Sequence, residues 1–177
     1  MHIDFLTQRF AERREDTALI WRDREYSYGQ LLDGIERARK ELARVPAGAV
    51  VSLEGDFSPR AITLLLALIE HGAVIVPLTS SVEQKKPEFR SIAEVEVIAA
   101  IDASDEVTFT ETGRRARHEL LLTLKERGHP GLILFSSGST GKSKAAVHDF
   151  VPLLEKFKVQ RHRKRAITFL LFDHIGG

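Results

Sequence analysis

Cysteine is absent from the sequence, and this absence excludes disulfide bonds, a thiolate nucleophile and a cysteine-ligated zinc site. The chain also lacks an excess of one charge, because 26 lysines and arginines face 25 aspartates and glutamates and leave a formal net charge of +1. That balance gives no reason to expect binding to nucleic acid or to an anionic membrane.

Long hydrophobic runs are missing as well. The longest spans residues 61–69 and is interrupted only by Thr63, so it is far shorter than the roughly 20 residues that cross a bilayer. Residues 1–5 lack the basic and apolar segments of a signal peptide. We therefore expect a soluble cytoplasmic protein with no membrane partner.

What the sequence does contain is the composition of an ordinary globular domain. Apolar residues make up 43% and charged residues 29% of the 177 residues, which argues against disorder. One domain with its own core fits this length, since about 150 residues per domain is usual.

Apolar runs alternate with helical patterns in the first half of the chain. Residues 49–53 and 73–78 are continuous apolar runs typical of buried strands. Between them Ser58 and Pro59 open a helix that Gly72 ends, and we predict this helix to be buried on nearly all sides. A strand–helix–strand unit of this kind indicates a layered α/β fold with helices on both faces of the sheet.

Shorter patterns predict the remaining elements. Ser27 and Gln30 have the spacing of a capping box, Asp4 can cap a first helix, and Ser80 and Ser81 can cap a helix that runs to residue 92. Further expected elements are a hairpin of residues 17–21 and 25–28, a strand pair of residues 95–101 and 107–110, a helix over 118–126, a helix around 153–157 and a strand over 166–171.

The most informative stretch follows residues 132–135, which have the pattern of a buried strand. It consists of small, hydroxylated and basic residues, namely Ser136, Ser137, Gly138, Ser139, Thr140, Gly141, Lys142, Ser143 and Lys144. The two glycines allow positive φ, so that backbone N–H groups can form a concave nest, and the hydroxyls and lysines add donors and positive charge. Because no acidic residue occurs between Arg127 and Asp149, a phosphate group is the expected ligand.

Two other interpretations of this stretch stay open. Gly/Ser-rich segments are often flexible linkers, although this one follows a strand and ends in two lysines. The ending Gly141-Lys142-Ser143 is also that of a Walker A loop, which requires glycine at position 136, where this chain has Ser136. A kinase or nucleotidase of that type predicts a helix immediately after Gly141, with Lys142 on the phosphate.

Residues 136–144 closely resemble the phosphate-binding signature of the adenylate-forming acid ligases, the superfamily of acyl-CoA synthetases, firefly luciferase and peptide-synthetase adenylation domains. The hydroxyl, glycine and threonine residues from 136 to 141 match the signature position by position, and Lys144 falls on its lysine. Ser143 and Ala145 replace the proline and glycine that are usual in the family.

A second likeness lies in residues 174–177. His174 and Gly176 resemble the His-containing motif that follows a later strand in these ligases and borders their acyl and nucleotide pocket. Without the resemblance, a lone histidine near a strand end would be interpreted as a structural or exposed residue.

The resemblance implies the first part of the large N-terminal domain of such a ligase, with residues 1–177 as a partial ATP- and acyl-binding domain and the C-terminal domain absent. The parent enzyme would join a small-molecule carboxylic acid to ATP, with Mg²⁺ on the phosphates and coenzyme A or a carrier's pantetheine as second substrate. The resemblance assigns catalytic roles to Thr140 and Lys144, nucleotide binding to Ser136, Ser137, Gly138, Ser139, Thr140, Gly141 and Lys144, acyl-substrate contacts to His174 and Gly176, and no metal ligand. The 177 residues alone are expected to be inactive and to bind ATP weakly or not at all.

Three further expectations concern partners. Residues 156–165 carry six basic side chains and no acid, but they include one aromatic residue, so we interpret them as a solvated loop rather than a nucleic-acid site. A partial sheet leaves an edge strand open, which suggests a dimer or higher assembly. A non-catalytic interaction module derived from a ligase is the remaining alternative, for which Ser143 and Ala145 are mild evidence.

Overall fold

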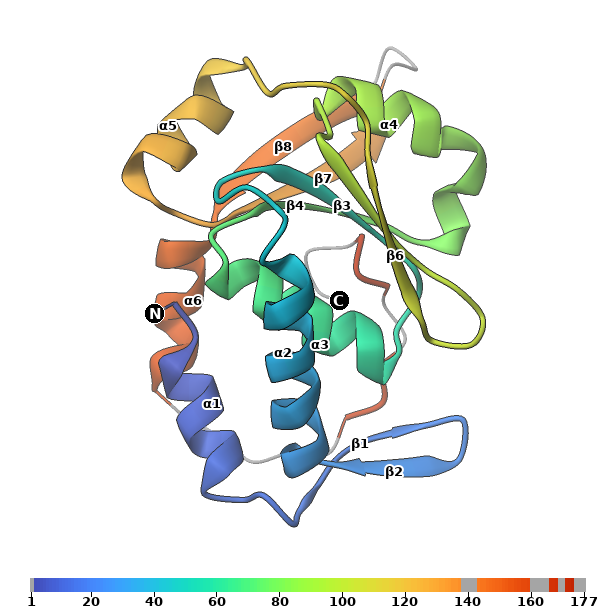
Figure 1. Ribbon diagram of the computed structural model, residues 1–177, viewed down its shortest axis with the longest axis vertical. Helices are drawn as coiled ribbons and strands as arrows, with labels where there is room; N and C mark the ends of the chain where they lie inside the picture. Colours follow the sequence, from blue (N-terminus) through green and yellow to red (C-terminus); the bar gives the residue numbers. More distant parts are fainter. Residues whose placement is uncertain (1, 138–142, 160–165, 169–170, 174–177) are drawn as a thin grey trace.

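The computed structural model describes residues 2–137, 143–159, 166–168 and 171–173. Its centre is a six-stranded sheet with the strand order β6-β5-β3-β4-β7-β8 (Figure 1). The strands are β3 (Val50–Glu54), β4 (Val74–Leu78), β5 (Val97–Ile101), β6 (Val107–Glu111), β7 (Gly131–Ser137) and β8 (Ser143–Asp149).

The inner strands of this sheet run parallel, and both edge strands are antiparallel to their neighbours. Every residue of β3 and β4 is buried, because helices cover both faces, and this explains their continuous apolar sequences. The connection from β3 through α3 (Pro59–Glu70) to β4 confirms the predicted strand–helix–strand unit.

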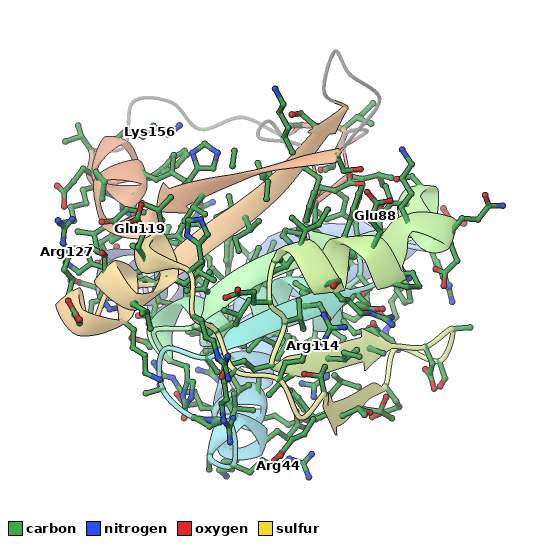
Figure 2. The ribbon with its side chains drawn as sticks, turned by 90° about the horizontal axis from the view of Figure 1, so that it is seen from above. Arg44, Glu88, Arg114, Glu119, Arg127 and Lys156 are labelled. Carbon is green, nitrogen blue, oxygen red and sulfur yellow. The ribbon has the colours of Figure 1, made fainter. Side chains whose placement is uncertain are left out.

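Helices form a layer on each face of the sheet, which confirms the predicted layered α/β fold (Figure 1). The first layer contains α1 (Asp4–Ala11), α2 (Tyr28–Leu42), α3 and α6 (Phe150–Lys158), and the second contains α4 (Lys86–Ile92) and α5 (Glu119–Arg127). Figure 2 looks onto the second layer, in which Glu119 marks α5 and Glu88 marks α4. None of the helices in the described ranges is long and apolar enough to cross a membrane.

The predicted signals at helix ends are confirmed in two helices. The Ser58 hydroxyl accepts a hydrogen bond from the Ala61 amide at 3.0 Å, Pro59 is the first residue of α3, and Gly72 follows the helix with a φ of +77°. Every residue of α3 is buried or half-buried, as expected. Ser27 and Gln30 form the full capping box of α2, and the predicted hairpin is present as β1 (Thr17–Trp21) and β2 (Arg24–Ser27).

The start of α1 corrects one prediction. Asp4 is not the cap but the first helical residue, and Ile3 stands at the cap position without a side-chain bond. Ile3 is fully buried, and its carbonyl accepts hydrogen bonds from the amides of Leu6 and Thr7. Burial of this apolar side chain fixes the start of the helix one residue earlier than the capping pattern predicts.

Residues 80–92 correct another prediction, because they do not form one helix capped by Ser80 and Ser81. They form a 3-10 turn, η1 (Ser80–Lys85), followed by α4, and Val82 has non-helical backbone angles inside the turn. The two serine hydroxyls bind distant carboxylates instead, Ser80 that of Asp56 at 2.7 Å and Ser81 that of Asp173 at 3.0 Å. Long-range hydrogen bonds therefore replace the local caps.

The end of the chain corrects a third prediction. Residues 166–168 and 171 are not in a strand, although we expected one over 166–171. The residues at 166–168 are exposed and belong to none of the strand pairs of the described sheet, whereas residues 169 and 170 of the predicted strand lie outside the described residues.

Candidate functional site

The β7–β8 hairpin carries the predicted phosphate loop. Its last paired positions are Ser136 opposite Lys144 and Ser137 opposite Ser143, and these four residues flank the loop on both sides. Ser136 and Lys144 are exposed. The predicted ligand residues Gly138, Ser139, Thr140 and Gly141 lie outside the described residues.

β8 was not predicted from the sequence, and it decides between two interpretations. The Walker A alternative requires a helix directly after Gly141, but the chain forms a strand from Ser143 to Asp149 that pairs with β7 over seven positions. The structure therefore contradicts the phosphate-loop kinase or nucleotidase.

The hairpin opens at the edge of the sheet where the inner strands end. β3, β4 and β7 are parallel, so their carboxyl ends lie on the same side, and this is where open α/β sheets bind ligands. β7 pairs with β4 at Val74–Gly131 and Ile75–Leu132, before the carboxyl ends are reached. Further along β4, Pro77 has no amide N–H to offer to a neighbouring strand.

A cavity of about 250 Å³ lies at this edge between β4, η1, α4 and the hairpin. Its lining residues are Pro77, Leu78, Ser81, Val82, Lys85, Phe89, Phe135, Ser136, Ser143 and Asp173. The rings of Phe89 and Phe135 stack in parallel with their centroids 3.9 Å apart and form its apolar wall. Both strands of the hairpin thus contribute a serine to the cavity.

Asp173 brings the end of the described chain to the same cavity. Its Oδ2 accepts hydrogen bonds from the hydroxyls of Thr79 at 2.9 Å and Ser81 at 3.0 Å. Next to it, the ring of Phe172 contacts that of Phe57 with centroids 4.0 Å apart. The residue that precedes His174 therefore lies beside Ser136 and Ser143, whereas His174 and Gly176 themselves lie outside the described residues.

Beneath the cavity a buried ion-pair network fixes α4 to the end of β3. Glu54 is 5% exposed, and Arg90 donates hydrogen bonds to its carboxylate from Nε at 2.6 Å and Nη2 at 2.5 Å. Ser52 donates a third at 2.8 Å. These bonds from Arg90 to Glu54 raise the pKa of the Arg90 guanidinium above its usual value. The network holds the wall of the cavity that α4 supplies.

Sequence reasoning missed Asp173, Thr79 and Glu54. Glu54 and Thr79 come directly at or after the ends of predicted strands, and Asp173 precedes the histidine of the second motif. The rule that carboxyl ends of parallel strands converge could have brought them together if the strand order had been known. No cluster of three potential metal ligands occurs among the residues with described positions.

Comparisons with known proteins agree with this architecture. No family model matches the chain. It is 32% identical over 163 residues to the nonribosomal peptide synthetase fmqA of Aspergillus fumigatus, an alignment that covers 82% of this chain and 4% of the synthetase. The chain thus matches a small part of a much longer protein.

Solved structures show which kind of domain this part resembles. The N-terminal subdomain of NpsA from Klebsiella oxytoca, in complex with 3-hydroxyanthranilyl-AMSN, superimposes with a TM-score of 0.60 and 27% identity over 82% of this chain and 38% of that one. The N-terminal domain of FACL13 from Mycobacterium tuberculosis shares the fold, with a TM-score of 0.61, 18% identity and coverage of 82% and 43%.

The fold of this chain is that of the N-terminal subdomain of adenylation domains. The chain belongs to the adenylate-forming acid ligase superfamily, as its loop and second motif indicated.

Proposed function

We propose that the chain is the N-terminal part of an ATP-dependent carboxylic acid ligase that forms an acyl-adenylate. The observation that carries the proposal is the cavity at the carboxyl edge of the sheet, which is lined by Ser136 and Ser143 at the base of the hydroxyl-rich loop and by Asp173 next to His174. The base of the loop and the residue before the second motif thus line one cavity.

In the proposed reaction a carboxylate oxygen attacks the α-phosphorus of ATP, a P–O bond to the β-phosphate breaks, and pyrophosphate leaves with the bonding electron pair. Negative charge grows on the leaving group. Loop N–H groups, the hydroxyls of Ser136 and Thr140 and the ammonium of Lys144 would stabilise that charge. Mg²⁺ bound to the phosphates would neutralise part of it.

The acyl-adenylate would then react with a thiol, either coenzyme A or a carrier's pantetheine, with release of AMP. His174 and Gly176 would border the acyl group. The first acids to test are 3-hydroxyanthranilate and 3-hydroxybenzoate, since NpsA binds AMSN conjugates of both. We also propose that residues 1–177 are a partial domain that completes its site with a further part of the enzyme, because they cover 38% of the NpsA subdomain.

Saturation-transfer NMR of ATP with the 177-residue chain tests the proposal, because the method detects weak binding. We expect a signal from the wild type and its loss in Gly141→Val, in which a branched side chain fills the proposed phosphate nest. An unchanged signal in Gly141→Val, or none in the wild type, would favour a non-catalytic interaction module. The chain alone should release no pyrophosphate from ATP with either acid, and steady release would contradict the partial site.

A further inference from the structure

Two adjacent lysines at the junction of η1 and α4 have different surroundings. Lys86 is buried, and its ammonium forms ion pairs with Glu83 and, at 3.9 Å, with the buried Glu54. Lys85 is exposed, and within the described part of the chain it takes part in none of the ion pairs. Protein carboxylates therefore hold Lys86, whereas Lys85 is available to a ligand.

Lys85 lines the same cavity as the base of the hairpin. Ser136 and Ser143 reach the cavity from β7 and β8, whereas Lys85 reaches it from η1, an element that the phosphate signature does not include. η1 is held in place from both sides, because Ser80 binds Asp56 and Ser81 binds Asp173. The turn that presents Lys85 is therefore held to the segment after β3 and to Asp173.

The charges around this cavity favour an anion. Lys85 lies on its wall, and Lys144 is exposed one residue beyond Ser143. Among the described lining residues Asp173 is the one carboxylate, and two hydroxyl groups donate hydrogen bonds to its Oδ2. The nearby Glu54 is bound by Arg90. Lys85 thus lies in the described lining with one hydrogen-bonded carboxylate, and Lys144 adds a second positive charge beside Ser143.

We propose that Lys85 is a second cationic contact for the polyphosphate of the nucleotide and binds it from the η1 side while Lys144 binds it from β8. This inference rests on the proposed function, since it adds a residue to the same site. A lysine on each side would hold phosphate oxygens between two ammonium groups, and charge-assisted hydrogen bonds of this kind are the strong ones.

Amide-detected NMR titration of the 177-residue chain with sodium tripolyphosphate, and separately with MgATP, tests Lys85. We expect Lys85→Met to raise the dissociation constant for both ligands roughly five- to tenfold, because it removes the charge and keeps the side-chain length. Lys85→Arg should stay near the wild type. Lys40→Met is the matched control, since Lys40 is exposed on α2, away from the cavity lining.

Each outcome decides a separate statement. Wild-type affinity in Lys85→Met together with weakened binding in Lys144→Ala would remove Lys85 from the site and leave the proposed function in place. If Lys85→Met weakens the binding of tripolyphosphate but not that of MgATP, Lys85 belongs to a site for free phosphates. That result would contradict the inference. Absence of binding of either ligand to the wild type at millimolar concentration would contradict the inference and the proposed function together.

Discussion

Glu54 shows how a single residue holds the frame of the site. Its carboxylate is buried at the end of β3 and receives hydrogen bonds from Arg90 and Ser52. A buried carboxylate is costly to desolvate unless cations and donors compensate it. Because Arg90 belongs to α4, this pair couples the helix that supplies Phe89 to the sheet.

We predict that Glu54→Ala lowers the free energy of unfolding by about 3 kcal/mol, because it leaves the Arg90 guanidinium without the carboxylate that it binds. Urea unfolding measures the change. The matched control is Glu88→Ala, because Glu88 lies on α4 like Arg90 but is exposed (Figure 2). This substitution should change the free energy of unfolding by less than about 0.5 kcal/mol. An equal effect of both substitutions would show that the buried network does not stabilise α4.

At the scale of elements, the segment between β6 and α5 depends on Glu94. Its carboxylate accepts hydrogen bonds from the amides of Arg117 at 2.6 Å and His118 at 2.9 Å, and His118 is the cap residue of α5. These backbone bonds, that from Arg117 first, lower the pKa of Glu94 below its ordinary value of 4.5. Glu94 thus ties the start of α5 to the segment before β5.

The lowered pKa gives the sign of a pH effect. A carboxyl group whose folded pKa lies below its unfolded pKa stabilises the fold above the unfolded value, and this contribution disappears as the pH falls through the folded value. We predict that Glu94→Gln is less stable than the wild type by about 1 kcal/mol at pH 7, a low value because the group is partly exposed. Urea unfolding from pH 7 to pH 2 should show this gap closing below pH 4.5. A gap that stays constant with pH would contradict the role of the charge.

Elements with local signals could be predicted from the sequence. The caps formed by Ser27 with Gln30 and by Ser58 with Ala61 join residues only three positions apart in the sequence. The apolar runs of β3 and β4 indicate a sheet that is covered on both faces. β8 carried no such signal, because its central residues Lys144, Ala145 and Ala146 are exposed and form a strand through pairing with β7. η1 was missed because its hydroxyls bind carboxylates far away in the sequence.

At the scale of the whole molecule, β8 is an edge strand of the sheet in the described part of the chain. Three consecutive residues of this strand are exposed, and unpaired strand edges tend to pair with other chains. We predict that the 177-residue chain self-associates through β8, so that its mass from light scattering rises with concentration. Ala145→Lys should shift this rise to higher concentration, because charge on an edge opposes pairing. A monomer at every concentration would contradict the proposal.

The candidate site also belongs to this scale. The loop from Ser136 to Lys144 and the motif at His174 could be recognised in the sequence. The arrival of the flanking residues Ser136, Ser143 and Asp173 at one cavity depends instead on the strand order and on the hydrogen bonds of Asp173 across the fold. Lys85 belongs to neither motif and was found only through the cavity that it lines. Contacts across the fold, rather than local patterns, assemble the candidate site.

Mapping the amide shifts that MgATP causes in the 177-residue chain tests the central claim most directly. If the hairpin and its cavity bind the phosphates of ATP, the largest shifts should fall on Lys85, Ser136, Ser143 and Lys144, and Lys144→Ala should reduce them. Shifts confined to another surface, or the same shifts in Lys144→Ala as in the wild type, would contradict the account.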